Sequence, residues 1–157
     1  MKKKLSVLLI VGLMIPLFVL FESCVTSKNV IVESGVSLSK YKYVVYGKEE
    51  NGDGELDDIM LMVQNEISKK LKTVSERQAL SLLDQGEYIL SPRVNIKTEK
   101  WDGGHTYITI SFFDFDTNQR LAVAKSSGIG LSISHDQQLA LEGIRKQLNK
   151  LFKEKTE

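Results

Sequence analysis

Apolar residues recur along this chain first at strand spacing and then at helical spacing. Residues 41–46 are rich in aromatic and β-branched side chains and stop at Gly47, which predicts a β-strand. From residue 56 the apolar positions return at intervals of three and four, which predicts a helix with one buried face. Those positions are Leu56, Ile59, Met60, Val63, Ile67 and Leu71.

The middle of the chain predicts a short helix and then a run of strands. Ser75 and Gln78 have the spacing of a capping box, so a second helix should run to about residue 84 and end near Gly86. Strand-type stretches separated by turn residues follow. They cover residues 88–101, 106–115 and 120–132. Pro92 cannot donate a ladder hydrogen bond, which predicts an edge or a bulge at that point.

A last helix is expected after Ser134, which begins another capping-box spacing. Its apolar stripe consists of Leu141, Ile144, Leu148, Leu151 and Phe152, with Gln147 expected on the solvent side. The predicted order is therefore β-α-(α)-β-β-β-α. A strand meander flanked by helices with one apolar face each predicts an α+β two-layer sandwich, with a mostly antiparallel sheet and helices on one face.

The first 24 residues have the order of a secretory signal. Three lysines at positions 2–4 precede an apolar run over residues 5–21, and the small Ser23 stands just before Cys24, the only cysteine of the chain. This order resembles a bacterial lipoprotein signal. The resemblance implies that the Cys24 thiol receives a diacylglyceryl group, that the chain is cut before it, and that the new amino group is acylated.

The expected organisation is thus a signal peptide over 1–23, a lipidated cysteine and tether over 24–38, and one α+β domain over 39–157. Within the tether, residues 30–32 could also pair as a short edge strand. An uncleaved membrane helix is an alternative for the leader, but this run of 17 residues would cover only about 25 Å of a roughly 30 Å hydrocarbon core. An ordinary secreted precursor is the third possibility. All three place the folded part outside the cytoplasm.

The balance of basic and acidic residues limits which partners are expected. The chain has 21 basic and 20 acidic residues, and without residues 1–23 it would keep 18 and 19, a net charge near −1. Nucleic-acid-binding proteins concentrate Lys and Arg, so no nucleic-acid partner is expected. No acidic residue lies in positions 25–29. In lipoprotein families acidic residues there can direct inner-membrane retention or surface display, so their absence favours the periplasmic face of an outer membrane.

A second resemblance covers roughly residues 32–152. It is carried by residues 38–43, the amphipathic helix, the strand entry at 86–90, the strand and turn at 113–118, and the final helix. These features are similar to small periplasmic lipoprotein domains of unknown function, and to the amino-terminal α/β domains of TolB and of the curli-secretion lipoprotein. The resemblance implies a fold far more than a role.

No catalytic or metal-binding constellation is found in the sequence. His105 and His135 have no partner at zinc-ligand spacing, and no cysteine follows Cys24. An acidic stretch alternates like calcium ligands, but its sixth position is Leu56 instead of Gly, and its twelfth is Met62 instead of Glu. Its alternating residues are Asn51, Asp53, Glu55 and Asp57. We therefore expect no enzyme, no cofactor and no metal.

Aromatic residues supply the candidate interaction site. Phe112 and Phe113 are adjacent in a predicted strand, so they should point to opposite faces, and one of them could meet a partner. The favoured function is a non-enzymatic envelope lipoprotein that binds a protein, or itself, through the sheet. The alternative is a module for a small molecule or cell-wall glycan, in which Trp101 and Tyr107 stack on a sugar ring.

Overall fold

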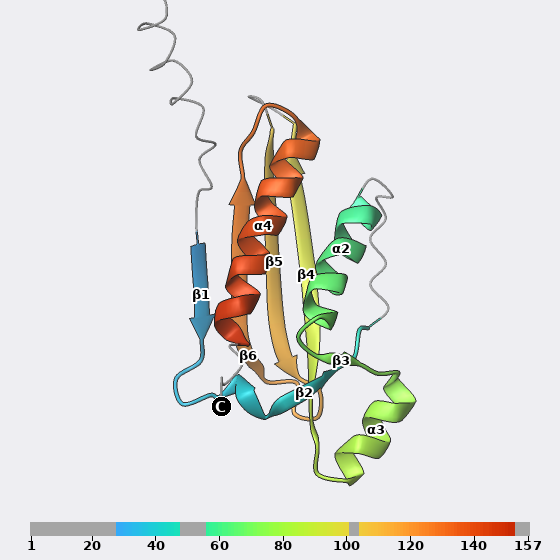
Figure 1. Ribbon diagram of the computed structural model, residues 1–157. Coiled ribbons are helices and arrows are strands. Elements are labelled where there is room, and N and C mark those ends of the chain that lie inside the picture. The colour runs from blue at the N-terminus through green and yellow to red at the C-terminus, as the bar shows by residue number, and fades with distance from the viewer. Residues whose placement is uncertain (1–27, 48–55, 101–103, 153–157) are drawn as a thin grey trace, which may run out of the picture.

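The computed structural model of the protein describes residues 28–47, 56–100 and 104–152 (Figure 1). Cys24, Trp101 and the alternating positions 51, 53 and 55 lie outside these ranges. The strands are β1 (Lys28–Val32), β2 (Tyr41–Val44), β3 (Lys72–Thr73), β4 (Tyr88–Glu99), β5 (His105–Asp114) and β6 (Arg120–Gly128). The helices are the short 3-10 turn η1 (Leu38–Lys40), α2 (Asp57–Ser68), α3 (Glu76–Asp84) and α4 (Ile133–Leu151). Among the described helices, none is both long and apolar enough to span a membrane.

The six strands form one sheet in the order β1-β6-β5-β4-β2-β3, which confirms the predicted α+β class. Strands β4, β5 and β6 are an antiparallel meander, and β1 extends it antiparallel to β6. On the other side β2 runs parallel to β4, and the two-residue β3 runs parallel to β2. The sheet is therefore mixed, with an antiparallel majority.

Strand β1 corrects the expected domain boundary. All five of its residues pair with β6, from Lys28 opposite Ser126 to Val32 opposite Ala122. Leu38, the last residue of the expected tether, is buried in the core. The folded domain thus includes residues 28–38, because the consecutive apolar residues 30–32, which the sequence allowed as an edge strand, pair with the edge of β6.

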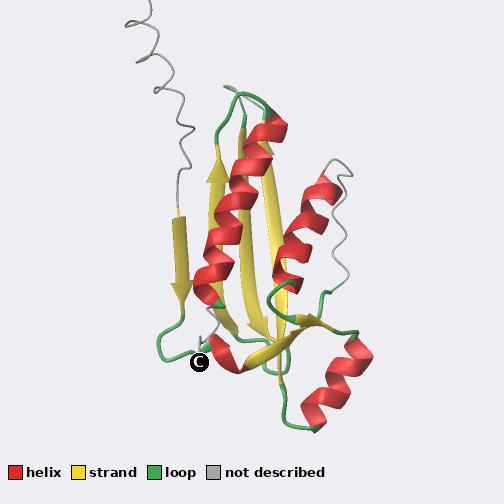
Figure 2. Ribbon diagram, viewed as in Figure 1, coloured by secondary structure: helices red, strands yellow, loops and turns green. Residues whose placement is uncertain are grey.

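Helices α2 and α4 lie across one face of the sheet and enclose the main core (Figure 2). The stripe expected for the first helix is buried at Ile59, Met60, Val63 and Ile67, and the last helix buries Ile144 and Leu148. These side chains pack on the inward residues of the central strands. Complete burial of Ile108, Ile110 and Phe112 places the centre of the core on β5.

Helix α3 packs against a separate and smaller apolar cluster. Its Ala79 joins Val45, Val74 and Ile89, whereas the chain neighbours of two of these residues, Val44 and Leu90, belong to the main core. Because successive strand residues point to opposite faces, α3 covers the reverse side of the sheet near the start of β4. The Ser75 capping box of α3 is formed as predicted, with Gln78 as its partner.

Two expectations about individual residues can be compared with the pairing. Pro92 lies beyond the end of β2, where β4 is paired with β5 but not with β2, so the missing N–H costs no ladder hydrogen bond there.

The last helix begins earlier than expected. Its N-cap is Ser132, whose hydroxyl accepts a hydrogen bond from the N–H of His135, and not Ser134.

The expected exposure of Gln147 is wrong. Its side chain is 1% exposed, and neither amide atom has a hydrogen-bond partner among the described residues. Helix α4 contacts α2, β1, β5 and β6, so its buried arc is wider than a single apolar stripe. A buried amide without partners costs about 1–3 kcal/mol of desolvation.

Removing that cost should stabilise the protein. Gln147→Met keeps the length of the side chain and removes its polar atoms, so we expect the free energy of unfolding to rise by about 1 kcal/mol. Urea titration measures the change. Asn149→Met, at an exposed position of the same helix, should change stability by less than about 0.5 kcal/mol. A loss of stability in Gln147→Met would mean that the amide is satisfied in solution.

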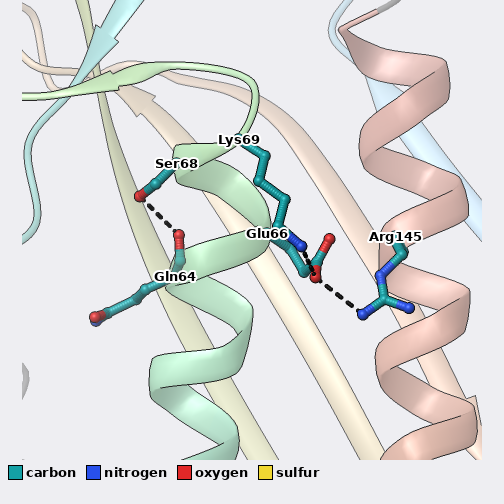
Figure 3. A network of polar contacts seen from close by, with 5 residues as sticks. All are labelled: Gln64, Glu66, Ser68, Lys69 and Arg145. Atoms are coloured by element: carbon teal, nitrogen blue, oxygen red, sulfur yellow. Dashed lines mark hydrogen bonds and ion pairs between the residues drawn. The ribbon is translucent and has the colours of Figure 1, made fainter.

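An ion pair between the buried carboxylate of Glu66 and the half-exposed guanidinium of Arg145 joins the two core helices (Figure 3). Glu66 on α2 is 7% exposed, and its Oε1 accepts hydrogen bonds from Arg145 Nη2 at 2.9 Å and Lys69 Nζ at 2.7 Å. In the same turn of α2, the Ser68 hydroxyl donates to the Gln64 carbonyl. The hydrogen bond from Arg145 is the main reason that the pKa of Glu66 lies below its ordinary value, although burial alone would raise it.

This pair should make stability depend on pH. Because the pKa of Glu66 is lower in the folded than in the unfolded chain, its contribution is present above the unfolded value and lost as the pH falls through the folded value. Arg145→Met should cost about 1–3 kcal/mol at neutral pH, since it removes a charged hydrogen bond from a buried carboxylate. The difference from wild type should shrink between roughly pH 5 and pH 3. Lys146→Met, one residue along on the exposed side, should show neither effect in the same titrations.

Candidate functional site

The face of the sheet opposite α2 and α4 carries the residues that the sequence singled out. Along β5, inward positions alternate with residues 107, 109, 111 and 113 on the other side. Phe112 points inward, is fully buried, and makes an edge-on contact with Phe152, with ring centroids 5.6 Å apart. Phe113 points to the other side and is half-buried. We call the side that carries Phe113 and Tyr107 the open face.

The two aromatic residues of the open face have different surroundings. The Arg93 guanidinium lies 4.3 Å from the centroid of the Phe113 ring and donates a hydrogen bond to Asn118 Oδ1 at 3.0 Å. Tyr107 is 37% exposed and stacks on His105, with ring centroids 4.9 Å apart. Six residues of extended strand, about 20 Å, separate Phe113 from Tyr107. They lie on one face but form two separate contact points, and Trp101 falls outside the described residues.

Basic side chains surround these aromatic residues. Residues paired across neighbouring strands share a face, which places Arg120 beside Phe113 and Lys125 beside Thr109. Lys97 pairs with Tyr107, and its Nζ lies 2.7 Å from Glu99 Oε1. This contact raises the pKa of the lysine and lowers that of the glutamate. The described open face thus has four basic residues, namely Arg93, Lys97, Arg120 and Lys125.

A shallow groove extends the open face to the sheet edge. Its volume is about 270 Å³, and Ile31 of β1, Val123 and Lys125 of β6 and Glu33 contribute to its lining. Ile31 is 60% exposed although it stands in the middle of a strand. Beyond β1 no described strand continues the sheet, so this edge joins exposed apolar surface to backbone groups that lack a ladder partner.

A second candidate site, which sequence reasoning missed, is a cleft of about 750 Å³ at the end of the sheet near α3. Three distant segments build it: residues 35–41, residues 80–88 and residues 114–121. The Tyr41 hydroxyl donates a 2.7 Å hydrogen bond to Asp114 Oδ2, while Asp114 Oδ1 accepts from the Thr117 N–H and hydroxyl. The β4–β5 hairpin brings the last two segments together, and the parallel pairing of β2 with β4, which no local motif indicates, adds the first.

The polar groups of the cleft have shifted acidities. Burial, and then the hydrogen bond to Asp114, raise the pKa of Tyr41 above its ordinary value. Burial alone would raise the pKa of Asp114, but the hydrogen bonds from Thr117, Tyr41 and the Asp116 N–H hold it below its ordinary value. Both groups are therefore fixed in one protonation state near neutral pH, which suits binding and positioning more than proton transfer.

An exposed aromatic ring forms one wall of the cleft. Tyr88 is 46% exposed, and the Lys40 ammonium lies 3.9 Å from the centroid of its ring. Tyr41 meets the same ring edge-on, with centroids 5.7 Å apart. The remaining charged lining consists of Asp84, Glu87, Asp114 and Asp116. The cleft thus combines a half-exposed ring, already contacted by Lys40 and Tyr41, with an excess of carboxylates.

His105 lies on the open face, His135 lies in the first turn of α4, and neither lines the cleft. His105 stacks on Tyr107, and His135 Nδ1 accepts the Leu131 N–H at 3.4 Å. Within residues 28–47, 56–100 and 104–152, no three His, Cys, Asp or Glu side chains are grouped as metal ligands. Of the alternating acidic stretch, only Asp57 is described, in the first turn of α2.

A buried aspartate that the sequence did not single out stands at the start of α4. Asp136 is completely buried, its Oδ1 accepts the Gly130 N–H, and its Oδ2 has no partner among the described residues. Glycines make room for it: a Cβ at Gly104 would lie 2.3 Å from Oδ2, and one at Gly128 would lie 2.1 Å from the Asp136 carbonyl oxygen. The position is a close packing contact between α4 and the sheet.

Comparisons with known proteins bear on the fold alone. No protein-family model matches the chain, and no curated protein matches it. Two crystal forms of the PelC dodecamer from Paraburkholderia phytofirmans are 21% and 19% identical, with TM-scores of 0.48 and 0.47; both matches cover 80% of this chain and 99% of that chain. A PDZ domain protein from Parabacteroides distasonis is 11% identical, with a TM-score of 0.47, over 86% of this chain and 37% of its own. The resemblance to TolB and the curli-secretion lipoprotein stays a prediction.

Proposed function

We propose that this chain is a non-enzymatic envelope lipoprotein, held at the periplasmic face of an outer membrane by lipid on Cys24, and that its open face binds a protein partner. The observation that carries the proposal is the asymmetry of the sheet. Helices α2 and α4 cover one face, whereas among the described residues only α3, near the start of β4, covers part of the other. A sheet in this arrangement can receive a partner without rearrangement of its core.

The charge of the open face indicates the chemistry of that partner. Beside its four basic residues lie two acidic ones, Glu33 in the edge groove and Glu99, and Glu99 is already paired with Lys97. The guanidinium of Arg93 stacked on Phe113 is a combination enriched at interface centres. We therefore propose an acidic segment of a partner protein as the occupant, with affinity that falls as salt rises.

Site-specific crosslinking in intact cells tests this proposal. A photo-reactive residue at Thr109, in the middle of the open face, should give one discrete adduct with an acidic protein, and 0.5 M salt during crosslinking of isolated envelopes should weaken it. The same residue at Lys146, exposed on α4, is the matched control and should give no such adduct. Equal adducts from both positions, or none from Thr109, would contradict the proposal. An adduct with twice the mass of the chain would instead identify a second copy of the chain as the occupant of the open face.

The anchor is tested separately. Cys24→Ser should leave an unprocessed or soluble species, because Cys24 is the only cysteine of the chain and its thiol receives the first lipid. Mass spectrometry of the membrane-bound wild type should find a chain that begins at Cys24 and carries acyl groups. An unmodified Cys24 in a full-length membrane-bound chain would instead favour the uncleaved helix.

The cleft favours a second candidate function, the binding of a small polar ligand or a cell-wall glycan. Its volume of about 750 Å³ falls within the usual range of ligand sites, and Tyr88 offers a ring for stacking. Calorimetry with soluble cell-wall fragments tests this function. Tyr88→Ala should abolish binding, while Tyr107→Ala, at the position first expected to stack on a sugar, should leave it unchanged. Binding unaffected by Tyr88→Ala would exclude the cleft.

A further inference from the structure

The loop between β6 and α4 presents an exposed apolar tip, made of Leu131 and Ile133. Leu131 is 86% exposed, the highest value among the large apolar residues described, and Ile133 is 40% exposed. Neither belongs to either core cluster. Two neighbouring aliphatic side chains in water at a loop tip have no role in the packing of the domain.

This tip stands at the end of the molecule where the leader enters the sheet. Strand β1 is antiparallel to β6 and begins with Lys28 opposite Ser126, two residues before β6 ends at Gly128. The chain then rises through the loop to the start of α4 (Figure 1). The cleft near α3 lies at the opposite end, where β4 begins.

The covalent distance from the anchor to this end is short. Four Cα–Cα steps separate Cys24 from Lys28, which limits their separation to about 15 Å. From Ser126 to Leu131 the chain can extend about 17 Å further. A lipid on Cys24 therefore holds this end of the sheet within reach of the bilayer surface, and because β1 is paired along its whole length, the sheet follows it.

The charges of the loop itself do not oppose contact with a lipid surface, and the exposed carboxylates at this end, Asp57 and Asp58, belong to the first turn of α2. Among the described residues of the loop and of the first turn of α4, the one carboxylate is Asp136, which is completely buried. Glu99, at the end of β4, is paired with Lys97. Anionic headgroups would thus meet no unpaired carboxylate of the described tip, and the aliphatic side chains can enter the interface.

We propose that the apolar tip inserts into the interfacial layer of the membrane that carries the anchor. The inference rests on the proposed attachment of the chain through its N-terminal segment. The lipid and the tip together make two points of contact with the membrane. The sheet then extends away from the membrane along its long axis, and the cleft at its far end faces the aqueous compartment. The tip adds membrane contact that a single flexible tether would not supply.

Fluorescence depth measurement on the full chain tests this. The protein is purified from membranes and reconstituted in vesicles of phosphatidylethanolamine and phosphatidylglycerol, and Leu131→Cys is labelled with an environment-sensitive fluorophore. The emission should shift to the blue and be quenched by a spin label on the lipid acyl chains. Leu80→Cys is the matched control, because Leu80 is 55% exposed and lies in the cleft lining at the other end. It should show neither effect.

Equal emission and equal quenching at the two positions would overturn the proposal. Circular dichroism of both variants must match the wild type, which separates a failure to insert from a failure to fold. Mass spectrometry of the same samples reports whether Cys24 is lipidated, so failure of the anchor is distinguished from failure of the tip. If Cys24 is unmodified, its thiol is labelled too, and the parental chain labelled in parallel supplies that background emission. A leader that stays uncleaved also precedes β1, so it attaches the same end of the sheet to the membrane.

Discussion

Phe112→Ser should leave most of the protein molecules unfolded, because it removes the largest fully buried side chain of the core. Loss of a buried phenylalanine ring costs about 3–5 kcal/mol, and a serine hydroxyl without a partner adds about 1–3 kcal/mol. The sum is comparable with the whole stability of an ordinary domain, about 5–15 kcal/mol. Urea titration followed by circular dichroism measures the loss.

Phe113→Ser is the matched control, since it makes the same change one residue further along the strand. Phe113 is half-buried on the open face, so the variant should lose about 1 kcal/mol from the Arg93 contact and some apolar burial. It should still fold, and the adduct from Thr109 should weaken. If both variants unfold, β5 is buried on both sides, and the proposed partner surface does not exist.

Gly128→Ala should be the most damaging glycine-to-alanine change among the described glycines. Its Cβ would lie 2.1 Å from the Asp136 carbonyl oxygen and 2.7 Å from the Ala140 backbone nitrogen. Both are backbone atoms of α4, so no side chain can move aside, and the helix itself must shift from the sheet. Overpacking of this kind costs about 3 kcal/mol or more.

Gly47→Ala is the control for that prediction. No atom lies within 4 Å of the position of its Cβ, and its φ is not positive. Alanine there should leave stability unchanged or raise it by about 0.4–1 kcal/mol, because it restricts the unfolded chain. Thermal unfolding of the two variants side by side measures the difference. A Gly128→Ala variant as stable as Gly47→Ala would show that the contact between α4 and β6 is looser in solution.

Local pattern was sufficient to predict the elements whose signal lies within one stretch of sequence. The period of α2, the Ser75 capping box and the antiparallel meander all depend on neighbours within a few residues, and the structure confirms them. Strand β3 was missed because two residues carry no period. Gln147 was misplaced because the width of a buried helix face depends on how many elements surround it.

The candidate sites depend on longer distances in sequence. Adjacent strand residues must face opposite ways, so the opposition of Phe112 and Phe113 could be predicted from their order alone. Which of them faces the helices could not, because that depends on the register of the whole meander. The cleft joins Tyr41 to Asp114, 73 residues apart, and only tertiary pairing reveals it.

The antiparallel ladder between β1 and β6 also determines how the domain resists force. A pull that begins at the proposed lipid acts on the chain just before Lys28 and along the axis of β1. The ladder hydrogen bonds lie perpendicular to that axis, so they are loaded in shear together and do not open one after another. A partner that pulls the domain away from the membrane would therefore load all five residue pairs at once, the arrangement in which these pairs resist force best.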